Sequence, residues 1–423
     1  MITVQIIIFI LGYLAITLEH PIRINKAASA LITGVLCWTV YIVSAPDTSI
    51  VNHQLLEHLG DISGILFFLL GAMTIVELID AHDGFDIITQ RVRTTDKRRL
   101  MWLVCSITFF LSAVLDNLTT AIVMVSLLRK LIRDKETRLL FCGMVVIAAN
   151  AGGAWSPIGD VTTTMLWIGG QITTVNIILK VFLPSLVSMV VPVLLVNLKL
   201  KGNLVPAEIS DESQKDITSS NTDKNIVFSS GIIILLLVPV FKMTTGLPPF
   251  MGILLGLGVM WVITEIIHST KDTGDKNILS VQYALRKIDT PSILFFLGIL
   301  AAVSALEATG VLHGLSQQLD KTIGDERLIV SIIGVLSAII DNVPLVAATM
   351  GMYSLEQYPI DHFFWQFLAY CAGTGGSILI IGSAAGVAAM GIEKIEFFWY
   401  LRKIAWLALL GYVAGAILFV LSV

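Results

Sequence analysis

Long apolar stretches, separated by short polar connections, fill most of the chain. Many of them approach the roughly 20 residues that an α-helix needs to cross the hydrocarbon core of a bilayer. The pattern predicts an all-α polytopic membrane protein. The predicted spans are 2–18, 26–45, 61–81, 138–168 and 176–198 in the first half and 226–241, 248–268, 291–309, 362–392 and 395–422 in the second, and two further apolar stretches, 100–128 and 328–354, carry an acidic residue near the middle.

A polar segment divides these apolar stretches into two halves. Residues 202–225 are rich in Ser, Asn, Asp and Lys, a composition typical of a connection in water. We expect this segment to be a cytoplasmic linker that acts as a tether. It would join a first repeat at 1–201 to a second repeat at 226–423.

Short motifs recur in the same order on both sides of the linker. They are an Ile-Leu-Phe-Phe-Leu run, an Asp-Asn pair, a Gly-Gly pair and a single Gly. One such match could arise by chance, but four in the same order indicate a duplication. The matching positions are 65–69 with 293–297, 116–117 with 341–342, 152–153 with 375–376, and 159 with 382.

The distribution of Lys and Arg predicts how the two halves are oriented. The loop 46–60 contains neither residue and is placed outside, since basic residues favour the cytoplasmic side. Basic clusters both precede and follow the stretch at about 100–130, which is therefore predicted to be a re-entrant hairpin entered from the cytoplasm. The same reasoning makes 328–354 a hairpin that enters from outside. The halves would then be inverted repeats, a plan typical of secondary transporters.

Composition supports a membrane environment and excludes several other classes. The 423 residues are 56% hydrophobic and only 14% charged, with a mean hydropathy of +0.86, whereas about a quarter of a soluble protein is charged. The sequence contains no basic cluster interleaved with aromatic residues, so it does not indicate nucleic-acid binding. The four cysteines lie in apolar segments without a Cys-x-x-Cys motif, so we expect small buried side chains rather than disulfides or metal ligands. Residues 4–18 are interpreted as a membrane span rather than a signal peptide.

Each predicted hairpin carries an Asp-Asn pair near its tip. A carboxylate at membrane depth costs several kcal/mol on most scales, so it is normally retained for a function. Oxygen ligands suit hard cations, and irregular backbone is tolerated at this depth where it lines a water-filled site. For a single pair the alternative is a helix cap in a tight turn. The candidate cation- and proton-binding residues of the hairpins are Asp116, Asn117, Thr119, Thr120, Asp341 and Asn342.

A second element with candidate ligands follows each hairpin. Pro157 lies inside the apolar stretch at about 138–168 and predicts a broken helix, whose free carbonyl and amide groups would lie beside Asp160. The mate segment, at about 362–392, has Ser383 where the first half has Asp160, so the halves are not chemically equivalent. A proline kink beside a buried, hydrogen-bonded Asp160 is the alternative. The candidate ligands of the broken helices are Asn150, Ser156, Asp160, Thr163, Thr374, Ser377 and Ser383.

Four further titratable residues are candidates for a proton path or for pH sensing. Glu77 and Glu307 occupy related places near the ends of spans in the two halves, and Glu19 and His20 lie at the inner end of the first span. Histidine titrates near neutral pH, which makes His20 a candidate sensor. The alternative for all four is an ordinary solvated position at the membrane interface.

The sequence resembles the NhaD-type sodium/proton antiporters of the ion transporter superfamily over essentially its whole length. The resemblance is carried by Glu19-His20 followed by 23–28 (Arg-Ile-Asn-Lys-Ala-Ala), by the two Asp-Asn hairpins, and by 156–160 (Ser-Pro-Ile-Gly-Asp). Related divalent-anion/sodium symporters carry Ser-Asn-Thr at their hairpin tips. The Asp in place of that Ser argues here against an anionic substrate.

The resemblance implies a secondary transporter and not an enzyme. It would exchange cytoplasmic sodium or lithium for external protons by alternating access, with elevator-like motion, as a homodimer in the bacterial inner membrane. Sodium, lithium, protons and membrane lipid would be its partners, with no cofactor and no nucleic acid. The residues expected to hold sodium are Asp116, Asn117, Asp160, Asp341 and Asn342.

Other functions remain open at this point. Arsenite permeases and other anion transporters share the superfamily and similar hairpins, although neither tip offers a cysteine for arsenic and no Arg is placed to clamp a dicarboxylate. A rival from another class is an intramembrane aspartyl protease, because 158–160 (Ile-Gly-Asp) resembles part of a Gly-x-Gly-Asp motif. The protease has no explanation for the internal repeat.

Overall fold

The computed structural model describes residues 2–89, 92, 94–204, 220–269 and 279–422. Throughout these ranges the regular structure is helical, and the one isolated β-bridge joins Asp96 to Asn203. Within the same ranges nine helices are long and apolar enough to cross a membrane. The prediction of an all-α polytopic membrane protein is confirmed at this level.

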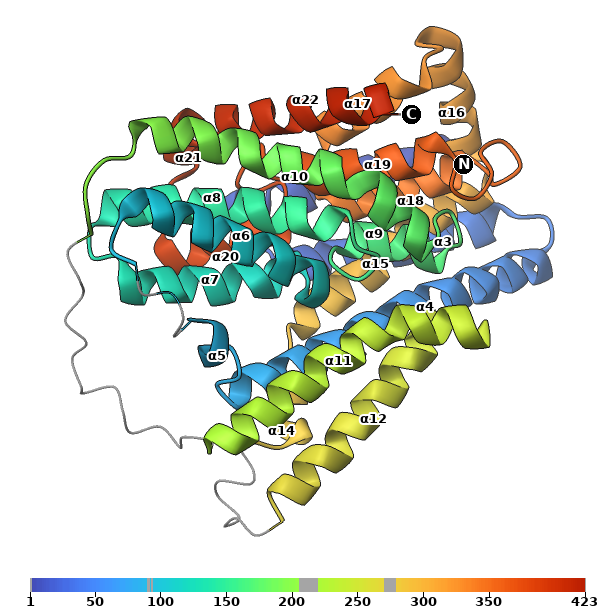
Figure 1. Cartoon of the computed structure of the whole chain (residues 1–423). Coiled ribbons are helices and arrows are strands. Elements are labelled where there is room, and N and C mark those ends of the chain that lie inside the picture. Colours follow the sequence, from blue (N-terminus) through green and yellow to red (C-terminus); the bar gives the residue numbers. More distant parts are fainter. Residues whose placement is uncertain (1, 90–91, 93, 205–219, 270–278, 423) are drawn as a thin grey trace.

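The helices pack as two groups, and in Figure 1 helices α4, α11 and α12 of the first lie below α8, α10 and α22 of the second. The first group is built around α3, α4 and α15, and the second around α8, α10 and α19. The first group comprises α1 (Ile2–Thr17), α3 (Lys26–Ser44), α4 (Thr48–Ala81), α11 (Asn221–Thr245), α12 (Pro249–Ile267), α14 (Val281–Lys287), α15 (Thr290–Ala308) and α16 (Val311–Thr322).

The second group contains the segments with the Asp-Asn pairs and the glycine motifs. Its contacts with the first group are made mainly by α18 on α15 and α16, with smaller ones between α4 and α9 and between α6 and α11. The second group comprises α6 (Lys97–Leu115), α7 (Asn117–Leu131), α8 (Lys135–Ala154), α9 (Val161–Ile168), α10 (Thr174–Lys199), α17 (Glu326–Leu336), α18 (Asn342–Met352), α19 (Phe363–Gly375), α20 (Ala384–Glu393), α21 (Phe397–Lys403) and α22 (Ala405–Ser422). Two single-turn helices, α2 (Glu19–Ile22) and α5 (Asp86–Thr89), lie in the connections.

Helix interruptions occur at matching places in the two halves. Helices α6 and α7 meet at the single residue Asp116, and α17 and α18 are separated by 337–341. The chain leaves helix again between α8 and α9, at 155–160, and between α19 and α20, at 376–383. The packing is crosswise, because α7 lies against α20 of the other half and α18 lies against α9.

Matched glycines in the two halves make matched close contacts. A Cβ on Gly152 would collide with the backbone carbonyl of Phe109 in α6, and a Cβ on Gly375 would collide with that of Gly334 in α17. Only glycine permits this approach of two helix backbones. Beside each contact a serine hydroxyl bridges the same helices, from Ser112 to the Ala149 carbonyl at 2.6 Å and from Ser337 to the Ala372 carbonyl at 3.2 Å.

Two stretches expected outside helices are helical. The loop predicted at 46–60 is mostly the start of α4, where Asp47 caps the helix by accepting a hydrogen bond from the Ser49 N–H at 2.8 Å. Helix α16, with polar residues along one side, was not expected because it is too polar to appear as a span. The reason is the same in both cases, since an amphipathic or capped helix needs no long apolar run.

The predicted linker at 202–225 has ordered ends. At its start the Leu204 N–H donates to the Thr95 carbonyl at 2.7 Å, and at its end Asn221 begins α11. The central part, 205–219, lies outside the described residues, and its cytoplasmic placement remains a prediction.

Candidate functional site

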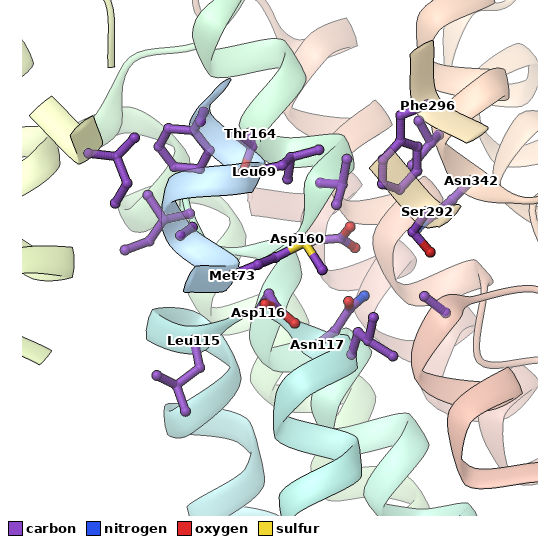
Figure 2. A pocket seen from close by; sticks show the side chains of 18 of the residues that line it. Leu69, Met73, Leu115, Asp116, Asn117, Asp160, Thr164, Ser292, Phe296 and Asn342 are labelled. Carbon is purple, nitrogen blue, oxygen red and sulfur yellow. The ribbon is translucent and has the colours of Figure 1, made fainter. Parts of the chain in front are cut away.

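A cavity of about 70 Å³ lies between the two helix groups. It is lined by charged and polar side chains from α3, α15 and the helix interruptions, and by an apolar wall from α4, α11, α12 and α15. Figure 2 shows Asp116, Asn117 and Asp160 close together, with Ser292, Phe296 and Asn342 on the other side of the cavity. The polar lining consists of Lys26, Asp116, Asn117, Asp160, Thr164, Ser292, Asp341 and Asn342.

Asp116 joins α6 to α7 in an unusual backbone conformation. Its φ of 101° and ψ of 161° fall in a region that is essentially restricted to glycine and costs a side-chain-bearing residue about 1–3 kcal/mol. The carboxylate accepts hydrogen bonds from the N–H of Thr119 at 2.7 Å and from its hydroxyl at 3.0 Å. These bonds fix the carboxylate at the N-terminus of α7, where it faces the cavity. Asp341, its counterpart, has an ordinary φ of −48°.

Asp160 is the most deeply buried carboxylate of the cavity. It is the N-cap of α9, is 2% exposed, and accepts one hydrogen bond through Oδ1 from the Thr162 N–H at 3.1 Å. Its Oδ2 has no hydrogen-bond partner among the described residues. A buried charged oxygen without a partner is costly, so this oxygen is available for a bound cation or a proton.

A chain of amide and hydroxyl groups runs behind the two carboxylates. The Nδ2 of Asn117 donates to Oδ1 of Asn150 at 3.1 Å. In turn, the Nδ2 of Asn150 donates to Ser383 Oγ at 2.8 Å and to Ser377 Oγ at 3.3 Å. The four residues come from α7, α8 and the α19–α20 interruption, so both halves of the chain contribute to this network.

Other polar residues at the broken helices stabilise the backbone through hydrogen bonds, although Thr164 also lines the cavity. The hydroxyls of Thr163 and Thr164 donate to the carbonyls of Ala154, at 3.3 Å, and of Pro157, at 2.9 Å, across the α8–α9 interruption. The Thr374 hydroxyl is bound to the Tyr370 carbonyl within α19 at 2.6 Å. Ser156 accepts a weak bond from the Ile158 N–H at 3.4 Å inside the turn.

Asp341 carries a positive partner that sequence reasoning missed. The Nζ of Lys26, the first residue of α3, lies 3.3 Å from Asp341 Oδ2. The same Nζ lies 4.4 Å from the centre of the Phe295 ring, a cation–π contact. In the sequence Lys26 stands out only as part of the motif at 23–28, and no local pattern connects it with Asp341.

Two further polar groups near the cavity lack partners among the described residues. They are the Nδ2 of Asn342, which is 4% exposed, and the hydroxyl of Thr120, which is fully buried. Asn342 lines the cavity, while Thr120 does not. Ser292, which also lines the cavity, was not predicted, and its hydroxyl is bound to Asp289 at the start of α15.

The residues proposed for a proton path lie elsewhere. Glu19 accepts a hydrogen bond from the backbone N–H of Lys26 at 3.1 Å. Glu77 is half-buried in α4, and Glu307 lies at the end of α15 against Gly351 of α18. None of the three lines the cavity. The side chain of His20 lies outside the part of the chain that the structure describes.

The lining limits what the cavity can hold. It presents three carboxylates against one ammonium group, so it favours a cation over an anion. Drug-sized ligands occupy roughly 300–1,000 Å³, whereas about 70 Å³ accommodates a small ion with few waters. Carboxylate and amide oxygens are ligands suited to a hard cation. The arrangement is therefore suited to a small cation, a proton, or each in turn.

Comparison with known proteins identifies relatives along nearly the whole chain. A family model described as a citrate transporter matches residues 7–373. Sodium/proton antiporter 1 of Arabidopsis thaliana is 52% identical over 412 residues, covering 97% of this chain and 70% of the relative. Sodium/proton antiporter 2 of the same plant is 49% identical over 411 residues, covering 97% of both chains. The Na(+)/H(+) antiporter NhaD of Vibrio cholerae is 30% identical over 445 residues, covering 98% of this chain and 91% of the relative.

Proposed function

The chain belongs to the family described as citrate transporters and, within it, to the NhaD-type sodium/proton antiporters, and on this basis we propose that it exchanges sodium or lithium for protons across a membrane. The relatives are named as antiporters, which are transporters and not enzymes, so no catalytic residue is assigned. Sodium and protons are the transported substrates, and such an exchanger needs no cofactor.

One observation carries the proposal. Asp116 and Asp160 face a single small cavity, and neither carboxylate forms an ion pair among the described residues. Within the described part of the chain, the Oδ2 of Asp160 lacks even a hydrogen-bond donor. A buried carboxylate in this condition needs a proton or a metal cation to balance its charge. Competition between the two for the same oxygens is the simplest basis for exchange.

The size and charge of the cavity favour this substrate over the one named by the family description. Citrate carries several carboxylates, which three aspartates would repel, and it needs far more space than about 70 Å³. The only basic group in the lining, Lys26, is already paired with Asp341. The same charge argument applies to other anions, while arsenite, which is neutral at physiological pH, is excluded less strongly and is included in the test below.

The remaining contacts in the proposed site would come from the side chains of Asn117 and Asn342 and from free backbone carbonyl groups where the helices are interrupted. We assign sodium to the cavity formed by Asp116, Asn117, Asp160, Asp341 and Asn342. Asn150, Ser377 and Ser383 support this site through the amide network and need not touch the ion. The contribution of Asp341 differs from that of Asp116 because of its ion pair with Lys26.

The arrangement of the helices supports alternating access. Matching helix interruptions, matched glycine contacts and crosswise packing of α7 on α20 and of α18 on α9 favour two repeats of one plan. We propose that the repeats are inverted and that each contains a re-entrant hairpin. The second helix group would move against the first as an elevator, because the cavity lies between them.

Direction, assembly and location complete the proposal. The antiporter would expel cytoplasmic sodium in exchange for external protons, as a homodimer in lipid. Its relatives come from a plant and from bacteria. Exchange of sodium for protons can operate in any membrane that maintains a proton gradient. We propose the bacterial plasma membrane as one that meets this condition.

Proton flux in proteoliposomes tests the proposed function. Purified protein is reconstituted with an internal pH dye, an inward-acid gradient is imposed, and sodium, lithium, potassium, citrate or arsenite is added. Sodium and lithium should dissipate the gradient, while potassium and citrate should not. Asp160→Asn, prepared in parallel at equal protein density, is the matched control and should be silent. Dissipation by arsenite or citrate, without a sodium response, would replace the proposal.

A further inference from the structure

We infer that Lys26 is a built-in counter-ion for Asp341, so that Asp116 and Asp160, and not Asp341, are the carboxylates left for the transported cation. This inference rests on the proposed function and goes beyond it. It assigns different roles to two aspartates that occupy matching places in the repeats. The Lys26 ammonium would take, at Asp341, the place of a second bound cation.

The position of Lys26 is fixed by its surroundings. It is the first residue of α3, where Asn25 caps the helix by accepting from the Ala27 N–H at 2.8 Å. Its own backbone N–H donates to Glu19 Oε1 at 3.1 Å. The aliphatic side chain then crosses to the second helix group, with Nζ over Phe295 and 3.3 Å from Asp341. The ammonium group is therefore directed at this carboxylate by contacts at the backbone of Lys26 and at Nζ.

The two aspartates differ in how their charge is balanced. Asp341 accepts from the Val343 N–H at 3.2 Å and pairs with Lys26. Asp116 accepts from Thr119, through its N–H and its hydroxyl, and forms no ion pair among the described residues. No lysine or arginine lies at an equivalent position beside Asp116 in the cavity lining. If Asp116 and Asp341 both bound a transported cation, Asp341 could do so only after the Lys26 ammonium group had moved away.

The charge of Lys26 acts on the whole cavity, because Lys26, Asp116 and Asp160 line the same space. Removing the charge of Asp341 leaves the positive charge of Lys26, which repels sodium. Removing the charge of Lys26 leaves the negative charge of Asp341, which attracts sodium. At an effective dielectric constant of about 20, a unit charge roughly 8 Å from the ion changes its affinity by about 30-fold. The two single substitutions should therefore act in opposite directions.

The test measures sodium affinity in the purified protein and in four of its variants: Lys26→Gln, Asp341→Asn, the double variant, and Lys26→Arg. Affinity is obtained from the rise of the unfolding temperature with sodium at alkaline pH, since a ligand that binds only the folded state stabilises it. Potassium at equal ionic strength is the control for non-specific salt effects. Unfolding without sodium is recorded for each variant, which separates stability from affinity.

We expect Asp341→Asn to weaken sodium binding by about 30-fold and Lys26→Gln to strengthen it by a similar factor. The sodium affinity of the double variant should return to within about threefold of that of wild type. The sodium affinity of Lys26→Arg should equal that of wild type. A purely structural ion pair would weaken binding in both single variants and would overturn the inference. If the double variant does not recover its sodium affinity, Asp341 is a direct ligand of sodium. This result would also overturn the inference.

The proposed function can fail separately in this experiment. Wild-type protein that gains no stability from sodium would overturn the proposed exchange, and the inference with it. Sodium binding by the wild type, with equal losses in the two single variants, would overturn only the role of Lys26. If Lys26→Gln alone does not fold, the comparison of Asp341→Asn with the double variant or with wild type still decides the question.

Discussion

The amide Nδ2 of Asn117 donates to Oδ1 of Asn150 at 3.1 Å and so joins the start of α7 to α8. Asn150 passes the connection to Ser383, which lies 233 residues further along the chain, at 2.8 Å. The polar support of the cavity is thus a single network that spans both halves. A substitution in one half is therefore expected to alter ion binding at carboxylates contributed by the other.

Neutralising Asp116 should nearly abolish sodium-driven proton release. Asp116→Asn keeps the shape of the side chain but removes a charge that balances the buried cation, and loss of one partner from a buried ion pair costs about 3–5 kcal/mol. Asp341→Asn should also reduce the release, because it leaves Lys26 unbalanced beside the cavity. Both are measured in proteoliposomes at the sodium concentration that half-saturates wild type. Near-normal antiport in either variant would remove that aspartate from the mechanism.

Asp160→Ala should be more damaging than Ser383→Ala, although the two residues occupy matching positions. Asp160 supplies a buried oxygen without a partner to the cavity, whereas Ser383 supports Asn150 and the Gly386 N–H from behind. We expect a loss of at least about 100-fold in the apparent sodium affinity for the first and less than about tenfold for the second. Equal losses at equal protein level would show that the halves are equivalent.

Asp116→Gly should give a more stable protein than Asp116→Ala, although both lack the carboxylate. The backbone at this position has φ 101° and ψ 161°, which glycine adopts freely and alanine adopts at a cost of about 1–3 kcal/mol. Thermal unfolding in one detergent, at one scan rate, compares the two variants. Neither should transport sodium. An alanine variant as stable as the glycine variant would mean that the backbone relaxes and holds no strain.

Single cysteines should show that the two Asp-Asn segments open to opposite sides. The four native cysteines are buried and free of disulfides, so a cysteine-free background is a reasonable starting point. In that background, Thr119→Cys should react with a membrane-impermeant thiol reagent mainly from the cytoplasmic side. Val343→Cys should react mainly from outside, and sodium should change both rates. Labelling of both from the same side would overturn the inverted arrangement of the hairpins.

Antiport should rise with alkaline pH and collapse in acid. A carboxylate that holds a proton binds sodium poorly, so acid should weaken the apparent sodium affinity, by about tenfold per pH unit when one proton is displaced per ion. The measurement is the apparent sodium affinity in proteoliposomes across roughly two pH units on either side of neutral. An affinity that does not depend on pH would rule out competition at Asp116 and Asp160 and would require separate sodium and proton routes.

The membrane class and the polar groups that line the cavity could be predicted from the sequence, while the duplication that its motifs indicate stays a prediction. Each depends on local composition or on a motif compared with its own copy. The length of an apolar run is set by the thickness of the bilayer, and an Asp-Asn pair inside such a run is conspicuous because charge is costly there. The five residues expected from the sequence to hold sodium line one cavity in the structure.

Only the tertiary structure shows that these residues differ in how their charge is balanced. Lys26 and Asp341 are 315 positions apart, and their ion pair depends on the packing of both α3 and α18 against α15. Two further features are visible only in the folded chain: the Oδ2 of Asp160 has no hydrogen-bond partner among the described residues, and Asp116 has a positive φ. Periodicity and motif spacing report the face or the span of a residue. They carry no information about which distant side chain neutralises its charge, because that is set by the distance between helices in the folded protein.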